Sequence, residues 1–510
     1  MSSASLLQNN PDHPSYDDLA LTVAKQQQEI ELYKFQLDQL KQYVYGRRSE
    51  KQYPVSPLQG NLFEQPVEKP SEPEVSIEVP SHKRHRGSKK AIPKDLPIDE
   101  VVYEFGETHC PCCAKELKEF SRDIREEVEF EPARFFKRHH VTVHKGCPKC
   151  KSVYSGETPL KNQPVIPGSQ IGAGFLGHMV TSKICDHMPY YRQSKIYKRE
   201  GVIIPDKTLS RYGLTVGSLL EPIAKTIKKE LLAKSYLQAD ETRLEVLDPK
   251  VKGKTHRGQL WLLNDPLGAL AYYEYHDSRS QFAASSLIGT YRGALQTDAY
   301  TCYDKHPGLQ LGCMAHARRY FVEASKLGNA RLNCAHVLKL IGKLYGIERD
   351  LRKLKKTMML DEWYQARLAV RQEQSGELLD DLQQYLVKIK DHWLLERHPM
   401  YKALNYMLNR YESFGEYTKD GRFEIDNNLA ENMMRPIALG RRNWLFAGSE
   451  YGARMSAVMM SVVQTCLRLG INPQRYLADV LPQLANHDTT SMDGLTPWDW
   501  ASVVEHKASA

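Results

Sequence analysis

The sequence predicts a multidomain protein of mixed α+β and α/β class, in which several small units precede a mixed-sheet core. Three observations support this prediction: heptad spacing near the N-terminus, two C-P-x-C pairs, and strand-like alternation that begins near Ser235. With 510 residues, 41% of them hydrophobic, the chain is long enough for about three or four domains. This composition excludes a wholly disordered protein.

The net charge and the spacing of the cysteines indicate which partners and which cellular compartment to expect. The net charge of +8, from 70 Lys and Arg against 62 Asp and Glu, is a modest bias toward polyanionic partners. No secretory signal opens the sequence, and no run approaches the ~18 apolar residues of a membrane span. Four of the 10 cysteines form two C-P-x-C pairs, which indicates metal binding in a reducing cytosol rather than disulfides. We therefore expect a cytoplasmic protein without a membrane segment.

An N-terminal unit over residues 1–51 contains the first expected element, a helix over residues 19–45. Its apolar residues recur with heptad spacing at Val23, Ile30, Leu37 and Val44 and, near the complementary position, at Leu19, Tyr33 and Leu40. This pattern predicts a short coiled coil that joins copies of the chain into a homodimer or higher oligomer. The alternative is an amphipathic helix packed on the chain's own core.

Residues 52–100 have the composition of a linker, with repeated Pro, Ser and Glu and then a basic cluster, HKRHRGSKK. Its candidate DNA contacts are Lys83, Arg84 and Arg86. These side chains either follow a phosphate backbone or are simply solvated.

A structural zinc site is expected within residues 101–160. Two C-P-x-C pairs supply four thiolates for tetrahedral Zn²⁺, at Cys110, Cys113, Cys147 and Cys150. The pairs are further apart than in a usual zinc ribbon, but residues 126–146 alternate like a β-hairpin that would bring them together. Cys112 is interpreted as a spectator, and alternative ligands are His109, His139, His140 and His144.

Residues 161–234 are expected to be helical and carry several basic side chains. Short helices, a glycine-containing turn and Thr208 as a helix cap fit a helix-turn-helix DNA-binding unit. A small helical bundle would show the same pattern.

From Ser235 the apolar period becomes strand-like. Three strand candidates, SYLQADETRLEVL, RGQLWLLNDP and ALAYYEYHDS, precede a helix around residues 280–287, a fourth strand in GALQTDAYTCYDK and a short run QLGCMA. This order fits the mixed sheet of an RNase H-like nucleotidyl-transfer core.

Two aspartates occupy these strands. Asp240 lies in the first strand between apolar neighbours, and Asp298 ends the fourth. A carboxylate in a buried strand is unfavourable unless it is paired or binds a metal. A divalent cation would relieve the repulsion between adjacent carboxylates, and an oxygen-rich, sparsely liganded site suits Mg²⁺.

The segment FEIDNNLAENMMRPIALGRRNWLFAGS, Phe423 to Ser449, supplies a third acid, Glu431. Ordinary explanations are a capping box with Asn428 or an ion pair with Arg435. If this helix packs against the two strands, the three carboxylates would hold two metal ions ~3.5–4 Å apart. Basic and aromatic residues of the same segment would then face DNA: Arg435, Arg441, Arg442 and Trp444.

Several other acids lie close to these in sequence: Glu241, Glu245, Asp248, Asp304, Glu424 and Asp426. Glu241 points to the opposite face of a regular strand from Asp240. Asp426 is the strongest rival of Glu431, although an Asp near a helix start is often a cap.

On these residues the chain resembles the transposases of the insertion sequence 66 group, a branch of the DDE transposases. The resemblance covers most of the chain and rests on YGRRSEKQ, the paired C-P-x-C motifs, PYYRQSKIYKREG, ADET, LQTDAYTCYD, CMAHARRYF, DNNLAENMMRPIALGRRNWLFAGSEYGA, INPQRYLADVLPQL and LTPWDW. One departure is Ala299, where the family more often has Gly.

The resemblance implies an RNase H-like core in two parts, 235–324 and 421–465, with a helical insertion at 325–420 and a C-terminal element at 466–510. It implies that Asp240, Asp298 and Glu431 are catalytic acids that bind two Mg²⁺ or Mn²⁺ ions. The implied reaction is cleavage at the ends of a mobile element and joining of those ends to target DNA. The implied partners are terminal inverted repeats, target DNA and companion proteins of the same element, at the bacterial nucleoid.

A basic helix after the fifth strand carries His316, Arg318 and Arg319, which would contact DNA, order the site, or form a solvated helix end.

Two other functions remain as alternatives: a non-catalytic zinc-containing DNA-binding protein, and a two-metal nuclease or resolvase on the same fold. Serine or tyrosine recombination is disfavoured because no nucleophile has a recognisable setting. Tyr300 and Tyr303 fit strand packing better.

Overall fold

The computed structural model describes residues 16–45, 135–140, 144–146, 153–155, 159–248, 251, 253–393, 395–486 and 491–508. Nearly all of them belong to one compact unit made of Met1–Gly46 and Arg138–Ala510, and a second unit covers Arg47–Lys137. The predicted basic-linker contacts and all four predicted zinc cysteines lie outside the described residues: Lys83, Arg84, Arg86, Cys110, Cys113, Cys147 and Cys150.

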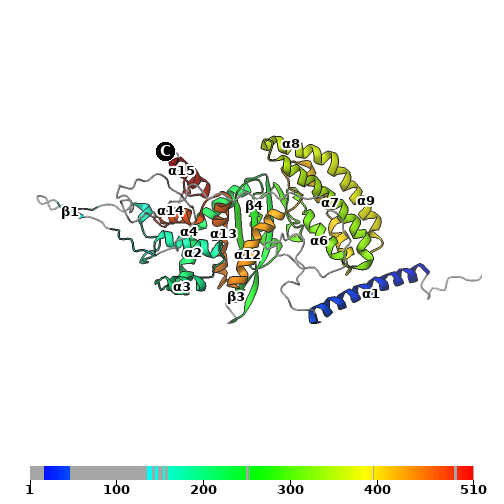
Figure 1. Cartoon of the computed structure of the whole chain (residues 1–510), viewed down its shortest axis with the longest axis horizontal. Helices are drawn as coiled ribbons and strands as arrows, with labels where there is room; N and C mark the ends of the chain where they lie inside the picture. The colour runs from blue at the N-terminus through cyan, green and yellow to red at the C-terminus, as the bar shows by residue number, and fades with distance from the viewer. Residues whose placement is uncertain are drawn as a thin grey trace, which may run out of the picture. The chain divides into compact units, whose positions relative to one another are not determined.

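A five-stranded mixed sheet, of which β3 and β4 are labelled in Figure 1, has the order β5-β4-β3-β6-β7. Its strands are β3 (Tyr236–Leu247), β4 (Thr255–Asn264), β5 (Ala271–His276), β6 (Ala294–Gln296) and β7 (Gln310–Leu311). The first three pair antiparallel, whereas β6 is parallel to both β3 and β7. The predicted order of three strands, a helix (α5, Gln281–Ile288), a fourth strand and a short fifth is confirmed.

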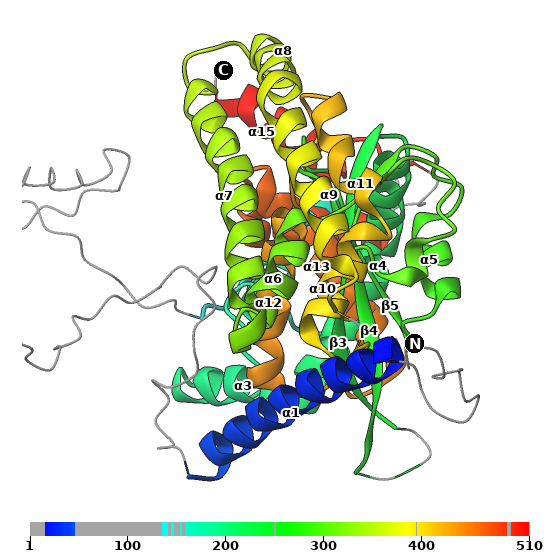
Figure 2. The ribbon, with the colours of Figure 1, turned by 90° about the vertical axis from the view of Figure 1, so that its right-hand side faces the viewer.

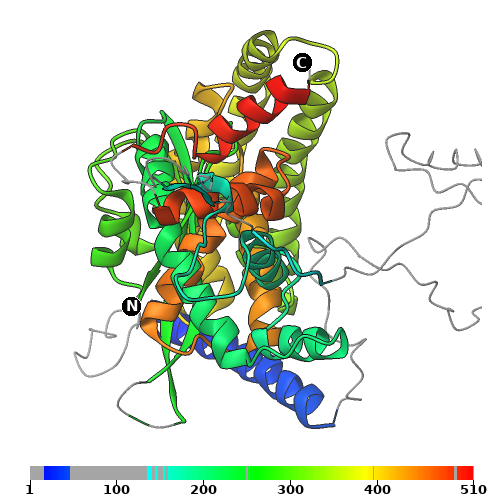
Figure 3. The same cartoon turned by 90° about the vertical axis from the view of Figure 1, so that its left-hand side faces the viewer.

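Helices on both sides of residue 235 share one hydrophobic core with this sheet. They are α2 (Ala173–Ile184), α3 (Tyr190–Arg199), α4 (Asp206–Leu232), α12 (Asn428–Trp444), α13 (Glu450–Arg468), α14 (Pro473–Asn486) and α15 (Pro497–Ala508) (Figure 3). The backbones of α4 and α13 approach closely at Gly217, where a Cβ atom would lie 2.7 Å from the Cβ of Met455. The predicted cap at Thr208 is wrong, because α4 begins at Asp206 after Pro205 and Thr208 lies in its first turn.

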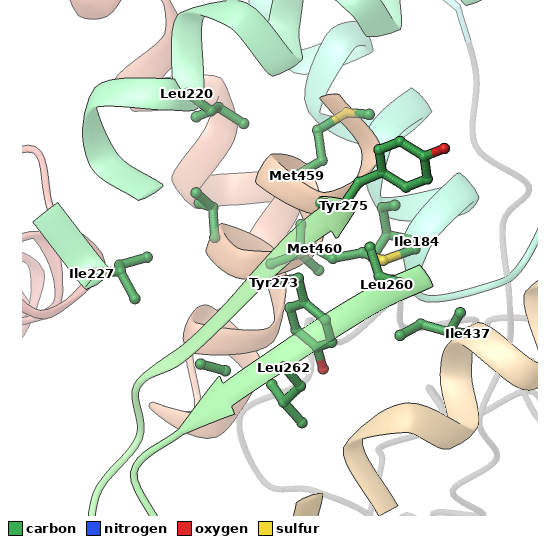
Figure 4. Close-up of a cluster of buried hydrophobic side chains, with 14 of the residues drawn as sticks. Ile184, Leu220, Ile227, Leu260, Leu262, Tyr273, Tyr275, Ile437, Met459 and Met460 are labelled. Carbon is green, nitrogen blue, oxygen red and sulfur yellow. The ribbon is translucent and has the colours of Figure 1, made fainter. Parts of the chain in front are cut away.

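Both faces of the sheet are buried. On the face shown in Figure 4, side chains of β4 and β5 pack against α2, α12 and α13 through Leu260, Leu262, Tyr273, Ile184, Ile437 and Met460. On the other face the ring of Trp261 meets Tyr303 edge-on, with ring centroids 5.9 Å apart. Burial on both sides explains why β4 has a continuous apolar run instead of strict alternation.

The predicted insertion is helical and has its own hydrophobic core, which extends to α6 (Met314–Ala324) and to β6 and β7 (Figure 2). Its elements are α7 (Arg331–Leu354), α8 (Leu360–Val370), a π-helical turn (Arg371–Ser375), α9 (Gly376–Lys390), α10 (Pro399–Leu408) and α11 (Tyr411–Gly415). Short 3-10 turns occupy Leu160–Asn162, Thr301–Tyr303, Gly328–Ala330 and Glu416–Lys419.

The N-terminal helix α1 (Tyr16–Tyr45) exposes its heptad residues Val23, Ile30 and Leu37, whereas Leu32 is buried. The heptad row is therefore not covered by other described residues of this chain. A coiled coil between copies stays a prediction.

The β-hairpin predicted over residues 126–146 lies mostly outside the described residues. Among the described ones, residues 135–140 have no regular structure, and β1 (His144–Gly146) pairs antiparallel with β2 (Val153–Ser155), on either side of the second C-P-x-C pair. A hairpin that joins the two C-P-x-C pairs stays a prediction. Among the described residues, no helix is both long and apolar enough to cross a membrane.

A buried ion cluster ties the insertion to the segment that leads into α12. Glu348 of α7 pairs with Arg367 (2.8 Å) and Arg371 (2.6 Å), and all three side chains are fully buried. Burial opposes ionisation of Glu348, but the two guanidiniums hold its pKa below the ordinary value. Arg371 also donates to the carbonyl oxygen of Phe423 (2.9 Å), and Arg367 to Glu424 (2.8 Å).

We expect Glu348→Gln to lower the free energy of unfolding by about 3–5 kcal/mol, because it leaves two buried guanidiniums without a full counter-charge. Chemical denaturation measures this loss. The matched control is Asp350→Asn on the same helix, where an exposed pair with Lys353 is removed and the unfolding midpoint should not move. Equal midpoints for both variants would contradict the assigned role of Glu348.

Candidate active site

The parallel pairing of β3 and β6 places two predicted acids side by side. Gln238 stands opposite Gln296 in the register, and Asp240 and Asp298 each follow by two residues. Asp240 also stands opposite Leu262 of β4, so it lies on the sheet face covered by α12 and α13. Both carboxylates therefore sit at the carboxyl end of the parallel pair.

Buried amides fix the start of α12 against these strands. Gln238 donates to the side-chain oxygen of Gln296 (2.8 Å) and to the carbonyl oxygen of Asp426 (3.2 Å). Gln296 donates to the carbonyl oxygen of Glu424 (2.8 Å). Asn427 donates to the carbonyl oxygen of Ala239 (3.0 Å). The first turn of α12, which carries Glu431, is thereby held beside Asp240.

The electrostatic effect of Asp298 and Glu431 on Asp240 indicates that the three carboxylates lie near one another. Burial raises the pKa of Asp240 well above its ordinary value, and the negative charges of Glu241, Asp298 and Glu431 raise it further. Asp298 and Glu431 keep 17% and 29% of their side-chain surface exposed, so the cluster is open to solvent on one side.

Positive groups flank this cluster. Arg279, in the loop between β5 and α5, pairs with both Glu241 and Asp298 (3.4 Å) and lies 3.6 Å from the ring centre of Tyr300. At the other end, Arg319 donates to Glu431 (3.2 Å). Sequence reasoning missed Arg279, because no motif or strand pattern marks a single arginine in a loop.

His316 and Arg319 both lie against Glu431, which fits the expectation that they order the site; Arg318 is half-exposed. Nδ1 of His316 is 3.4 Å from a carboxylate oxygen of Glu431. Burial lowers the pKa of His316.

Asp426, the strongest rival of Glu431, has a structural role. It is 5% exposed, accepts hydrogen bonds from the hydroxyl of Tyr345 (2.8 Å) and from the backbone N–H and the side chain of Asn428 (3.1 and 2.8 Å), and forms the turn before α12. The ordinary explanations of Glu431 are wrong. The N-cap is Asn427, and within the described chain Glu431 pairs with His316 and Arg319 rather than with Arg435.

The other rival acids also have partners elsewhere. Glu241 stands opposite Trp261 on the far face of the sheet, is 1% exposed and accepts from Tyr303 (2.9 Å). The remaining ion pairs are Glu245 with Arg257, Asp304 with Arg410, and Glu424 with Arg367.

The predicted DNA-contact residues of α12 separate into two kinds. Arg435 and Arg442 are exposed. Arg441 instead donates to Thr242 (3.1 Å) and to the carbonyl oxygen of Arg243 (2.7 Å), so it fastens α12 to β3. Trp444 is half-buried, with the ammonium of Lys183 5.7 Å from its ring centre. Arg441 and Trp444 thus also take part in packing, and the prediction that all four residues face DNA stays a prediction.

The insertion holds the backbone that follows β6. The hydroxyl of Tyr406 donates to the carbonyl oxygen of Asp298 (2.7 Å), and Arg410 donates to the carbonyl oxygen of Ala299. Ala299 has a φ of +61°, a left-handed conformation that favours glycine. The one departure that the sequence showed from its family pattern thus falls at a position where glycine would fit without strain.

Three neighbouring carboxylates, whose charges together raise the pKa of Asp240, form a donor set suited to a hard divalent cation. One oxygen of Asp240 accepts the backbone N–H of Glu241 (2.9 Å), and one of Asp298 accepts that of Tyr300 (3.0 Å). The second oxygen of Asp298 lies 3.4 Å from Arg279, and Arg319 donates to both oxygens of Glu431, so a bound cation would share or replace these contacts. As an all-oxygen donor set, the three carboxylates fit Mg²⁺ or Mn²⁺.

Comparison with known families gives four matches along the chain. Residues 168–455 match the model described as Transposase IS66 family, and residues 461–498 match the IS66 C-terminal element. Residues 107–151 match the zinc-finger binding domain of transposase IS66, and residues 32–101 match a model described as Transposase C of IS166 homeodomain.

Two similar proteins come from Sinorhizobium fredii. The uncharacterized protein y4hP is 31% identical over 502 residues, which cover 91% of this chain and 88% of the relative. The uncharacterized protein y4jD is 28% identical, over 90% of this chain and 93% of the relative.

We expect Gln296→Met to destabilise the protein by about 1–3 kcal/mol, because it removes one of the two acceptors of Gln238 and the side-chain donor to the carbonyl oxygen of Glu424 in the core. Chemical denaturation measures the change. Gln310→Met on neighbouring β7 is the control, since it removes only two long hydrogen bonds of 3.3 Å at a partly exposed site. A Gln296→Met variant as stable as that control would refute the positioning role of the amide.

We expect Ala299→Gly to stabilise the protein by about 1 kcal/mol, because glycine adopts a positive φ without a Cβ clash. Thermal unfolding measures the change. The same substitution in the middle of helix α8, Ala366→Gly, should have the opposite sign and destabilise by about 1 kcal/mol. Loss of stability in Ala299→Gly would argue against the left-handed conformation.

Proposed function

The chain belongs to the IS66 transposase family, and on this premise we propose that it is a DDE transposase that cleaves DNA at the ends of a mobile element and joins those ends to target DNA. The observation that carries the proposal is the convergence of Asp240, Asp298 and Glu431 from two strands and a helix. The sheet order, with β4 antiparallel between β3 and β5 and with β6 and β7 parallel to β3, supports an RNase H-like core.

Asp240, Asp298 and Glu431 would hold two Mg²⁺ or Mn²⁺ ions. When bound, these ions would neutralise charge at the scissile phosphate and lower the pKa of the attacking water or hydroxyl. Arg279 and Arg319 stand beside two of the acids and would reduce the repulsion between the carboxylates and the DNA. The amides that fix α12 would keep the acids in place for both steps.

The proposed reaction has two phosphoryl transfers at one site. In the first, a water oxygen attacks the phosphorus at the element's end, the bond from phosphorus to the 3′ oxygen breaks, and a 3′-hydroxyl is released. In the second, that hydroxyl attacks a target phosphodiester, and a target 3′-hydroxyl leaves. Alignment and charge stabilisation account for most of the rate, so no covalent protein intermediate is needed.

DNA would approach the acids along exposed basic side chains. Arg435 and Arg442 of α12 and Arg319 of α6 are exposed, and we propose that they contact the phosphate backbone. The basic linker residues Lys83, Arg84 and Arg86 would extend this contact.

The zinc-finger match over 107–151 supports a structural Zn²⁺ on Cys110, Cys113, Cys147 and Cys150. The exposed heptad row of α1 supports assembly through that helix.

We expect Asp240→Asn, Asp298→Asn and Glu431→Gln each to lower Mg²⁺-dependent cleavage of an end-containing duplex by a thousandfold or more, about 4 kcal/mol of transition-state stabilisation. DNA affinity, measured in parallel, should stay within about threefold of wild type, because the phosphate contacts remain.

Asp426→Asn is the matched control, since this acid bonds to Asn428 in the turn before α12. It should keep measurable cleavage. A full defect in Asp426→Asn together with an active Glu431→Gln would mean that the third acid is Asp426. A pre-cut 3′-hydroxyl end supplied with target DNA tests joining separately, and cleavage without joining would favour a nuclease or resolvase.

A further inference from the structure

A second group of metal-ligand side chains adjoins Glu431. Among the described residues, one ligand atom each from Cys313, His316 and Glu431 lies within 4.8 Å of the other two. We propose that these three residues form a binding site for a borderline transition-metal ion of the Zn²⁺ class, distinct in ligand chemistry from the three-carboxylate site and joined to it through Glu431.

The chemistry of the donors selects the ion. A thiolate, an imidazole nitrogen and a carboxylate are the ligands of zinc and of similar ions such as Co²⁺, whereas Mg²⁺ prefers oxygen ligands alone. Three protein ligands leave one tetrahedral position for water. The side chains of His316 and Glu431 keep 17% and 29% of their surface exposed, so an ion can reach them from solvent.

The geometry is already close to that of a site. Two ligand atoms on a tetrahedral zinc ion lie about 3.5 Å apart, given bonds of about 2.0 to 2.3 Å. Nδ1 of His316 and the nearer oxygen of Glu431 are 3.4 Å apart. This nitrogen is buried and has no hydrogen-bond partner among the described residues. The sulfur of Cys313 lies within 4.8 Å of one ligand atom of His316 and one of Glu431, so a small shift of side chains would let all three ligands meet one ion.

The backbone pre-arranges the cysteine and the histidine. Cys313 is the N-cap of α6 and His316 lies in its first turn, so their i,i+3 spacing directs both side chains to one face of the helix. The sulfur of Cys313 is fully buried and accepts the backbone N–H of Asn427 (3.2 Å). Burial and the charge of Asp426 raise the pKa of the Cys313 thiol, whereas the backbone N–H groups of Asn427 and His316 lower it. The metal ion would therefore have to supply the charge that stabilises the buried thiolate. The carbonyl oxygen of Ile425 accepts the N–H of Met314 (3.2 Å), which holds α6 beside the start of α12.

The positive charge of Arg319 beside Glu431 does not prevent a metal ion from binding there. Arg319 donates to both oxygens of Glu431 at 3.3 and 3.2 Å, and it can keep the outer oxygen while the other binds a metal. Glu431 would then belong to two sites. On the proposed function, which this consequence assumes, an ion held by Cys313 and His316 draws Glu431 away from the catalytic ions and inhibits cleavage.

Metal content of the full chain tests the site without DNA or catalysis. Purified protein is loaded with Co²⁺ or Zn²⁺, freed of excess metal and assayed for bound metal and for the thiolate-to-Co²⁺ absorption. We expect Cys313→Ser and His316→Gln each to bind one metal ion per chain fewer than wild type. The metal bound by the zinc-finger segment does not affect this difference, because the segment is the same in all variants. The matched control is Cys334→Ser, another fully buried cysteine, whose thiol contacts the sulfur of Met400 and which belongs to no group of three metal-ligand side chains among the described residues; this variant should bind as wild type does.

Equal metal content and equal spectra in wild type, Cys313→Ser and His316→Gln would overturn the proposal and leave His316 as a plain partner of Glu431. If Cys313→Ser fails to fold by circular dichroism, His316→Gln alone decides. The linked readout is inhibition: Zn²⁺ should reduce Mg²⁺-dependent cleavage at a concentration at least tenfold lower for wild type than for Cys313→Ser. Absence of any cleavage by wild type would count against the proposed function and not against the metal site.

Discussion

Three fully buried amides, Gln238, Gln296 and Asn427, form the constraint on which the rest of the site depends. Through them, β3 is bonded to a segment 188 residues away, which then becomes α12. A buried amide without partners is costly, so each amide allows few positions for the chain that it bonds. The first turn of α12 thus has a defined place on the sheet, and the third carboxylate has a defined place beside the first two.

The helical insertion also positions the site through polar contacts. Its buried cluster of Glu348, Arg367 and Arg371 bonds the segment before α12, and Tyr406 and Arg410 hold the backbone of Asp298 and Ala299. The insertion therefore contacts the chain on both sides of the candidate site. A long interval between the second and third acids is compatible with a rigid site, because the intervening residues are themselves part of its support.

Much of this arrangement could be predicted from the sequence. A strand pattern of apolar residues, interrupted by an acid, made Asp240 a candidate catalytic acid. The short apolar strand before Asp298 made that residue the second candidate. The choice between Glu431 and Asp426 could not be made from sequence, because it depends on the hydroxyl of Tyr345, which reaches Asp426 from the insertion. Sequence reasoning missed the pair of Arg279 with Asp298. It also did not foresee the hydrogen bond of Arg441 to β3, because neither contact has a local sequence pattern.

The most direct test of the central claim is the position of Mn²⁺ ions, located by anomalous scattering in crystals of the full chain soaked with Mn²⁺. The account predicts two peaks about 3.5–4 Å apart among Asp240, Asp298 and Glu431. Peaks that lie elsewhere, or no peak among these three carboxylates at saturating Mn²⁺, would contradict it.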